Sequence, residues 1–148
     1  MQVSQKSFYA LRAIFELAKN KDQGPVKIAD IAKAQAIPQR FLEVILSQLK
    51  QAGFVTSRRG NDGGYMMVRE PAELTVGEVM DFIQGPIGLV PCMNDGSMAE
   101  NCLLRENCVF RGMWEKLNAA ISNVFNDVTF SDLVRQEKQQ VHPCVASQ

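Results

Sequence analysis

The chain has 148 residues, 46% of them hydrophobic, which is enough to bury one core within the usual size of a single domain. Its formal net charge is zero, yet residues 1–70 carry 11 Lys or Arg against six Asp or Glu, so the first part of the chain suits a polyanionic partner. No apolar stretch approaches the roughly 18 residues of a membrane span, and Arg12 and Glu16 interrupt the apolar residues near the start, so we expect no signal peptide and predict a cytoplasmic protein.

Three helices are predicted in the first 52 residues. Residues 4–19 form an amphipathic pattern, a shorter helical pattern covers 26–34, and a third covers 38–52. Pro38 suits the first turn of the third helix, where its missing N–H would have no partner, and Gly53 supplies the C-cap. The third helix has a core face spaced at i, i+3, i+4 and i+7, made by Leu42, Ile45, Leu46 and Leu49.

A β-hairpin is predicted next. Two strand-like runs, 54–57 and 65–68, flank a basic segment rich in glycine, 58–64. Two short helices followed by a hairpin with a basic tip is the order of elements in a winged helix-turn-helix. We therefore expect a mainly α fold with a small β-hairpin, and a DNA-binding domain over residues 1–84.

The second half of the chain combines a loop with a long helix. Thr75 and Glu78 form a capping box that opens a helix ending near Gly85, and residues 85–105 are expected to be a cysteine-bearing loop with at most a short helical turn. From about residue 106 to 128 the apolar residues alternate by four and three, a heptad pattern typical of a helix packed on another helix. Burial of this apolar face on the chain's own core is the alternative, but we favour burial against a second subunit. A short helix from 129 completes the unit over 106–136, and a flexible tail is expected over 137–148.

The DNA contacts are expected on the third helix and the hairpin tip. In a helix-turn-helix the first helix, here 26–34, crosses the DNA backbone while the second lies in the major groove. Arg40 suits guanine or phosphate, Glu43 a cytosine amino group, and Gln39 adenine, while Arg59 suits a minor groove. Each residue alone is more often solvated surface, so the prediction depends on the order of elements. The full expected set is Gln39, Arg40, Glu43, Ser47, Arg58, Arg59 and Gly60.

Three cysteines are candidate metal ligands. Cys92, Cys102 and Cys108 lie in and beside the polar loop, with no C-x-x-C pair among them. Zinc usually takes four ligands in closer pairs, so the spacing disfavours structural zinc. Thiolates on such a loop suit an iron–sulfur cluster, although inert thiols remain an alternative. Cys144, in the tail, is the weakest candidate.

The stretches KSFYALRAIFELA, SRRGNDGGY, LTVGEVMDFI and FSDLV, together with residues 24–55, resemble the Rrf2-type winged-helix regulators, which include IscR-, NsrR- and RirA-like iron–sulfur sensors. The resemblance covers residues 1–136. It implies a homodimer joined by the long helix, a 2Fe–2S or 4Fe–4S cluster on the three loop cysteines, and DNA contacts at Arg40, Glu43 and Arg59.

The chain departs from the family pattern at two positions. Arg111 stands where IscR-like proteins have a histidine, and Phe8 stands where some NsrR-like proteins have an aspartate. The fourth cluster ligand is therefore unassigned. Its candidates are a small thiol, water, Asp95, Glu100, Glu106, His142 and Cys144.

The leading hypothesis is a homodimeric regulator that binds a roughly palindromic site on double-stranded DNA under the control of an iron–sulfur cluster. A winged-helix regulator without a cluster, sensing through thiols or a protein partner, is the first alternative. An iron–sulfur electron-transfer or carrier protein is the second. An enzyme is not expected, because the only histidine is His142 and no nucleophile–base pair or phosphate loop is present.

Overall fold

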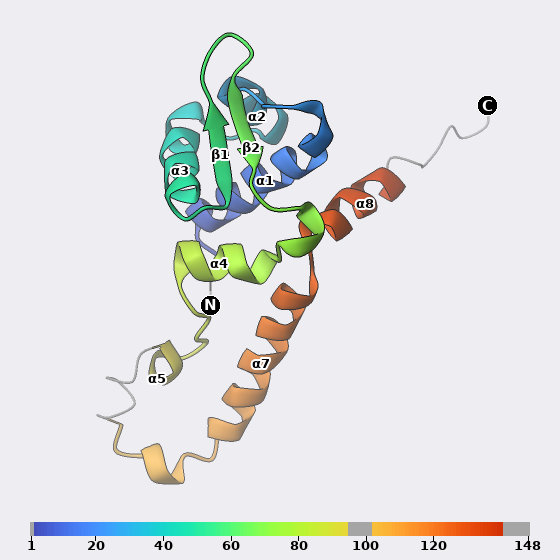
Figure 1. The fold of residues 1–148 in the computed structure, drawn as a ribbon. Helices are drawn as coiled ribbons and strands as arrows, with labels where there is room; N and C mark the ends of the chain where they lie inside the picture. The colour runs from blue at the N-terminus through green and yellow to red at the C-terminus, as the bar shows by residue number, and fades with distance from the viewer. Residues whose placement is uncertain (1, 95–101, 141–148) are drawn as a thin grey trace, which may run out of the picture.

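The computed structural model describes residues 2–94 and 102–140. It confirms the mainly helical fold with a small hairpin: a two-stranded antiparallel sheet lies against α1 (Gln5–Lys19) and α3 (Gln39–Gln51), and one long helix leaves the end of this domain opposite the hairpin tip (Figure 1). No helix in the described part of the chain is both long and apolar enough to cross a membrane.

Helix α1 (Gln5–Lys19) is the centre of the domain and contacts α2, α3, α4 and α8. Ser4 caps it by accepting a hydrogen bond from the backbone N–H of Ser7 at 3.1 Å. Ala10 and Ala13 are fully buried, and their small side chains let the neighbouring helices approach closely. The core around α1 is completed by residues from α2, α3, β1, the segment before α4, α4 and α8: Ile31, Leu42, Leu46, Leu49, Val55, Leu74, Val79 and Phe130.

Helices α2 (Ile28–Gln35) and α3 (Gln39–Gln51) form the predicted helix-turn-helix. The turn between them uses Ala36 in the left-handed conformation (φ 50°), and Ile37 fills the core beneath it. Pro38 is the N-cap of α3, one residue before the predicted position. At the other end Gly53 adopts φ 79°, so that the N–H of Phe54 reaches the carbonyl of Leu49 at 3.0 Å and closes the helix.

The hairpin pairs β1 (Val55–Arg58) with β2 (Gly64–Met67), with Arg58 opposite Gly64. The start of α2 predicted at Val26 is wrong, because Val26 forms a β-bridge instead. Its N–H and carbonyl exchange hydrogen bonds with Tyr65 at 2.9 and 2.8 Å. The bridge attaches the segment before α2 to the edge of β2.

Helix α4 (Val76–Gln84) begins with the capping box that the sequence predicted, and a short 3-10 helix, η2 (Pro71–Glu73), precedes it. The Glu78 carboxylate accepts from the N–H of Thr75 at 3.0 Å and from Arg69 at 2.7 Å. Partial burial alone would raise the pKa of Glu78, but the hydrogen bonds from Arg69 and Thr75 outweigh it and hold that pKa below its ordinary value.

The segment after α4 contains α5 (Pro91–Asn94) and a 3-10 turn, η3 (Arg105–Asn107), before the long helix α7 (Arg111–Asp127). The long helix thus begins later than the predicted residue 106, because Cys108 is extended (φ −72°, ψ 107°) and interrupts the helical backbone. Helix α8 (Phe130–Gln140) continues past residue 137, where the sequence suggested a tail. Another 3-10 turn, η1 (Lys21–Gln23), follows α1.

A short junction connects α7 and α8 to the domain. The N–H of Val76 donates to Val128 at 2.9 Å, and the N–H of Phe130 donates to Leu74 at 3.1 Å. Phe130 is fully buried in the core beside α1. The end of α7 is therefore held by backbone pairing on one side and by a core aromatic ring on the other.

Candidate nucleic-acid interface and candidate metal centre

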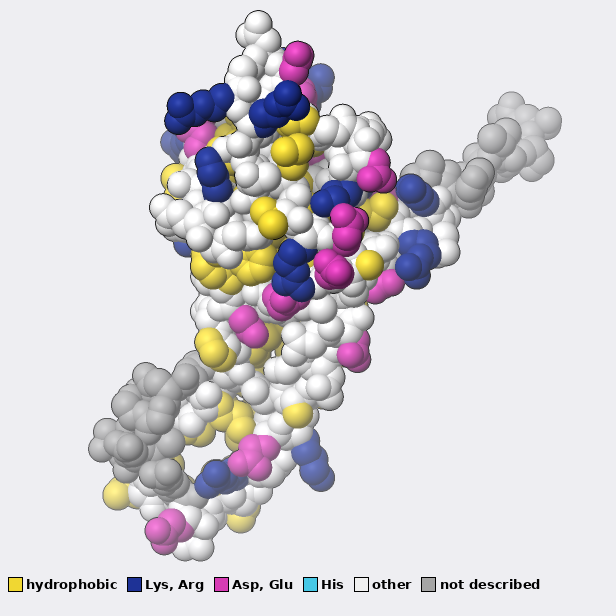
Figure 2. All heavy atoms as spheres, in the orientation of Figure 1, with side chains coloured by type: hydrophobic (Ala, Val, Ile, Leu, Met, Phe, Trp, Pro, Cys, Tyr) yellow, Lys and Arg dark blue, Asp and Glu magenta, His cyan; other side chains and the backbone are white. Residues whose placement is uncertain are grey.

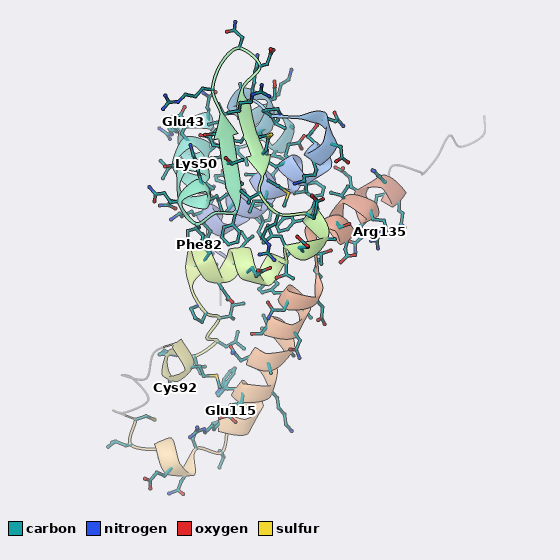
Figure 3. All side chains as sticks on the ribbon, in the orientation of Figure 1. Glu43, Lys50, Phe82, Cys92, Glu115 and Arg135 are labelled. Carbon is teal, nitrogen blue, oxygen red and sulfur yellow. The ribbon has the colours of Figure 1, made fainter. Side chains whose placement is uncertain are left out.

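The exposed side of α3 carries the side chains expected to read DNA. Its buried positions face α1, so Gln39, Arg40, Glu43 and Ser47 are all exposed. Figure 3 labels Glu43 on this outer side of the helix. Gln39 donates to the Glu43 carboxylate at 3.3 Å, and the Arg40 guanidinium lies 4.8 Å from the centre of the exposed Phe41 ring. The face thus offers guanidinium, amide and carboxylate groups together.

The hairpin loop brings the remaining expected residues to the same end of the molecule. Arg58, Arg59 and Gly60 are exposed, and the hairpin tip and the first turn of α3 lie at the end of the domain opposite α7 (Figure 1). Figure 2 shows Lys and Arg side chains gathered around this end, with some acidic ones among them. A polyanion approaching this end would meet the exposed Arg40, Arg58 and Arg59.

Gly64 fixes the position of the hairpin. A Cβ atom on it would lie 2.4 Å from the carbonyl oxygen of Val26, so only glycine permits the close approach. The Val26–Tyr65 bridge depends on this approach, and it joins the hairpin to the segment before α2.

Lys50 belongs to this surface, although the sequence prediction did not include it. Its Nζ donates to the hydroxyl of Ser57 on β1, so it links the end of α3 to the hairpin. Glu43, Ser47 and Lys50 are spaced at i, i+4 and i+7, which puts them on one face of α3. That spacing was readable from the sequence, but the contact with the hairpin was not.

The three candidate cysteines line one hollow of about 140 Å³ at the far end of the molecule. Cys92 comes from α5, while Cys102 and Cys108 lie on either side of η3, and all three are free thiols. Figure 3 labels Cys92 on α5 and Glu115 on α7, the two helices on either side of the hollow. The remaining lining residues are Met93, Arg111, Trp114 and Glu115.

Of the proposed fourth ligands, only Glu106 lies in the described part of the chain, and it is exposed and does not line the hollow. The others lie outside the described residues: Asp95, Glu100, His142 and Cys144.

Arg111 and Glu115 form an ion pair in the wall of the hollow. The Arg111 Nε donates to the Glu115 carboxylate at 2.8 Å. This hydrogen bond and the charge of Glu115 raise the pKa of Arg111, with smaller contributions from Cys108 and Cys92. The guanidinium therefore lies within electrostatic range of two of the three thiols.

Three free thiols are a donor set of the kind that holds iron–sulfur clusters. Within residues 2–94 and 102–140, no three Cys, His, Asp or Glu side chains converge as one metal ion requires. Thiolates that bind different irons of a cluster need not converge on one point. The hollow of about 140 Å³ is also far larger than the roughly 10–15 Å³ that one water molecule occupies on the same measure.

Helix α7 has an apolar face that the rest of the described chain does not cover. Its heptad residues divide into a half-buried set, which includes Trp114 and Ile121, and an exposed set. Exposure is 60% at Phe110, 44% at Leu117 and 62% at Val124. An exposed apolar row of this length is typical of a helix that packs on another helix.

Comparisons with known proteins agree with this architecture along nearly the whole chain. A family model described as "Rrf2: Iron-dependent Transcriptional regulator" matches residues 3–136. The HTH-type transcriptional regulator IscR of Cronobacter sakazakii is 30% identical over 138 residues, which cover 93% of this chain and 83% of that protein. Among solved structures, T. potens IscR is 28% identical with a TM-score of 0.78, covering 97% of this chain and 93% of that one. CymR, the global cysteine regulator of B. subtilis, is 31% identical with a TM-score of 0.76, covering 92% and 98%.

Proposed function

This chain belongs to the Rrf2 family of transcriptional regulators, and from that premise we propose that it binds its operator as a homodimer under the control of an iron–sulfur cluster on Cys92, Cys102 and Cys108. The observation that carries the proposal is the gathering of three free thiols around one hollow beside α7. The family description as iron-dependent and the likeness to IscR support it.

Operator recognition is assigned to α3 and the hairpin. We expect α3 to enter the major groove with Gln39, Arg40, Glu43 and Ser47, because these exposed side chains project from the second helix of the helix-turn-helix. We expect the hairpin to reach the adjacent minor groove through Arg58, Arg59 and Gly60. Glu43 would penalise wrong bases more than it adds affinity, since a carboxylate accepts only from a cytosine amino group.

We assign the interface of the homodimer to α7. Phe110, Leu117 and Val124 are exposed along one side of that helix, and burial of such a row against a second copy would remove it from water. Two-fold symmetry of the protein then implies two half-sites in the DNA, so the operator should be roughly palindromic.

When bound, an iron–sulfur cluster would supply a centre whose integrity depends on oxidants and on the iron supply. The positions of the cysteines in this chain determine how cluster binding would affect the fold. Cys92 belongs to α5, whereas Cys102 and Cys108 precede α7, so ligation by all three ties α5 to the start of α7. Helix α7 in turn contacts α4, and both α4 and α3 pack on α1, so the thiols connect to α3 through packed helices.

A regulator that senses through its thiols without a cluster is the second candidate. Cys92 and Cys102 are exposed free thiols, and Arg111 lies in the same hollow. The likeness to CymR, described as a cysteine regulator, supports this alternative. An electron-transfer or carrier role has less support, because it has no use for the exposed basic hairpin.

Purification without oxygen, followed by iron and sulfide analysis and an absorption spectrum, separates the two candidates. The proposal predicts coloured protein with matching iron and sulfide, and loss of both in Cys92→Ala, Cys102→Ala and Cys108→Ala. Cys144→Ala is the control, and it should keep the chromophore. Colourless wild-type protein whose DNA affinity changes on thiol oxidation would favour the second candidate instead.

A further inference from the structure

Glu115 is the one carboxylate among the described residues that line the cysteine hollow. It lies on α7 one turn after Arg111, so the two side chains share a face of that helix. The other side chains that line the hollow, apart from the cysteines, are poor candidates for the fourth ligand of a cluster. Arg111 has no lone pair to donate, Trp114 is a donor only, and the thioether of Met93 is a weak ligand.

The Glu115 carboxylate lies in the wall of the hollow, and its ion pair with Arg111 is easily broken. Its partner is Arg111, at 2.8 Å, and both side chains are more than half exposed. Exposed ion pairs of this kind contribute little to stability, so the pair opens at small cost. A carboxylate can therefore exchange Arg111 for a metal ion without leaving the hollow.

We propose that Glu115 is the fourth, oxygen ligand of the cluster that Cys92, Cys102 and Cys108 hold. This inference rests on the proposed function, since it needs a cluster in the hollow. A carboxylate is a harder and more exchangeable ligand than a thiolate, so one iron of the cluster has a labile position. In the cluster-free protein the carboxylate returns to Arg111.

Four proteins test the assignment after anaerobic reconstitution with ferrous iron and sulfide: wild type, Glu115→Gln, Glu106→Gln and Arg111→Gln. The readouts are iron per chain, the electron paramagnetic resonance spectrum of the reduced cluster, and the half-life of the chromophore in a ferrous chelator. Glu106→Gln is the matched control, because that carboxylate is exposed and lies outside the hollow.

We expect Glu115→Gln to shorten the half-life at least about tenfold, the scale of losing a group that supports a metal site, and to shift the resonance spectrum. Glu106→Gln should match wild type in both readouts. Arg111→Gln should keep the wild-type spectrum, because it removes the ion pair but leaves the carboxylate free to bind.

Two results would overturn the assignment while leaving the proposed function intact. One is a cluster in Glu115→Gln with the half-life and spectrum of wild type. The other is a spectral shift and a shortened half-life in Arg111→Gln equal to those in Glu115→Gln. That result would mean that the ion pair, and not ligation by Glu115, supports the cluster. A wild-type protein that takes up no iron and sulfide would instead overturn the proposed function and the assignment together.

Discussion

Gly77 on α4 lies directly against α7, and Gly77→Ala tests whether this contact fixes the long helix. A Cβ atom at Gly77 would lie 1.9 Å from Oδ1 of Asn126 on α7 and 3.3 Å from its backbone nitrogen. The Asn126 side chain would have to rotate, and the two helices would have to separate slightly. Gly112→Ala is the matched control, because nothing lies within 4 Å of its Cβ position.

The magnitude follows from comparing the two alanine variants. Gly77 and Gly112 are each the second residue of a helix, so both substitutions gain about the same helix propensity, roughly 0.5–1 kcal/mol. Their difference isolates the steric cost, which for overpacking is typically about 1–3 kcal/mol. Because Asn126 is exposed and its side chain can turn toward solvent, we expect the lower part of that range, about 1–2 kcal/mol.

Urea denaturation of both variants and wild type at one protein concentration measures this difference, since the stability of the proposed dimer would depend on concentration. Gly112→Ala should be as stable as wild type or more so, and Gly77→Ala should be less stable than Gly112→Ala. Equal free energies of unfolding for the two variants, within about 0.5 kcal/mol, would mean that α4 and α7 do not pack as described.

Three further predictions concern DNA binding, assembly and pH. Arg59→Ala should weaken binding to all duplexes in titrations at several salt concentrations, whereas Glu43→Ala should mainly relax sequence preference in a binding selection; unchanged behaviour of both would exclude α3 and the hairpin as the reading surface. Leu117→Arg should shift sedimentation at micromolar concentration toward monomer, while Ala119→Arg, exposed on another face of α7, should not; a stable dimer in both would move the interface elsewhere. Because the folded pKa of Glu78 is lowered, wild type should be more stable than Glu78→Gln above about pH 4.5 and lose that advantage as pH falls through the lowered pKa; a difference that does not change with pH in urea titrations would contradict this.

Much of the winged helix was predictable because its signals are local. The apolar spacing of α3, the capping box at Thr75 and the glycine after α3 each report on residues within one or two turns. The cap that starts α8 is of the same kind, since Thr129 and Asp132 bond to each other.

The errors arose where distant residues decide the local structure. Val26 lies beside the apolar residues Ile28 and Ile31, and this pattern predicts helix. The structure instead places Val26 in a β-bridge with Tyr65 on β2. The helix predicted from residue 106 includes Cys108, but that residue is extended, and the apolar spacing that begins at Phe110 does not reveal this.

The candidate metal centre was only half predictable. Residue type indicates the three cysteines, but nothing in the local sequence links Glu115 on α7 to a thiol on α5. The predicted helix already places Arg111 and Glu115 one turn apart, but only the structure shows that both line the hollow.

We propose that cluster occupancy sets operator affinity, and one measurement tests this directly. An operator is selected from random duplexes with anaerobic protein that carries the cluster, and its affinity is then measured for that protein and for the same preparation after the cluster is removed. We expect affinities that differ at least about fivefold, the lower end of typical allosteric couplings. Equal affinities of the two forms for every selected duplex would contradict it.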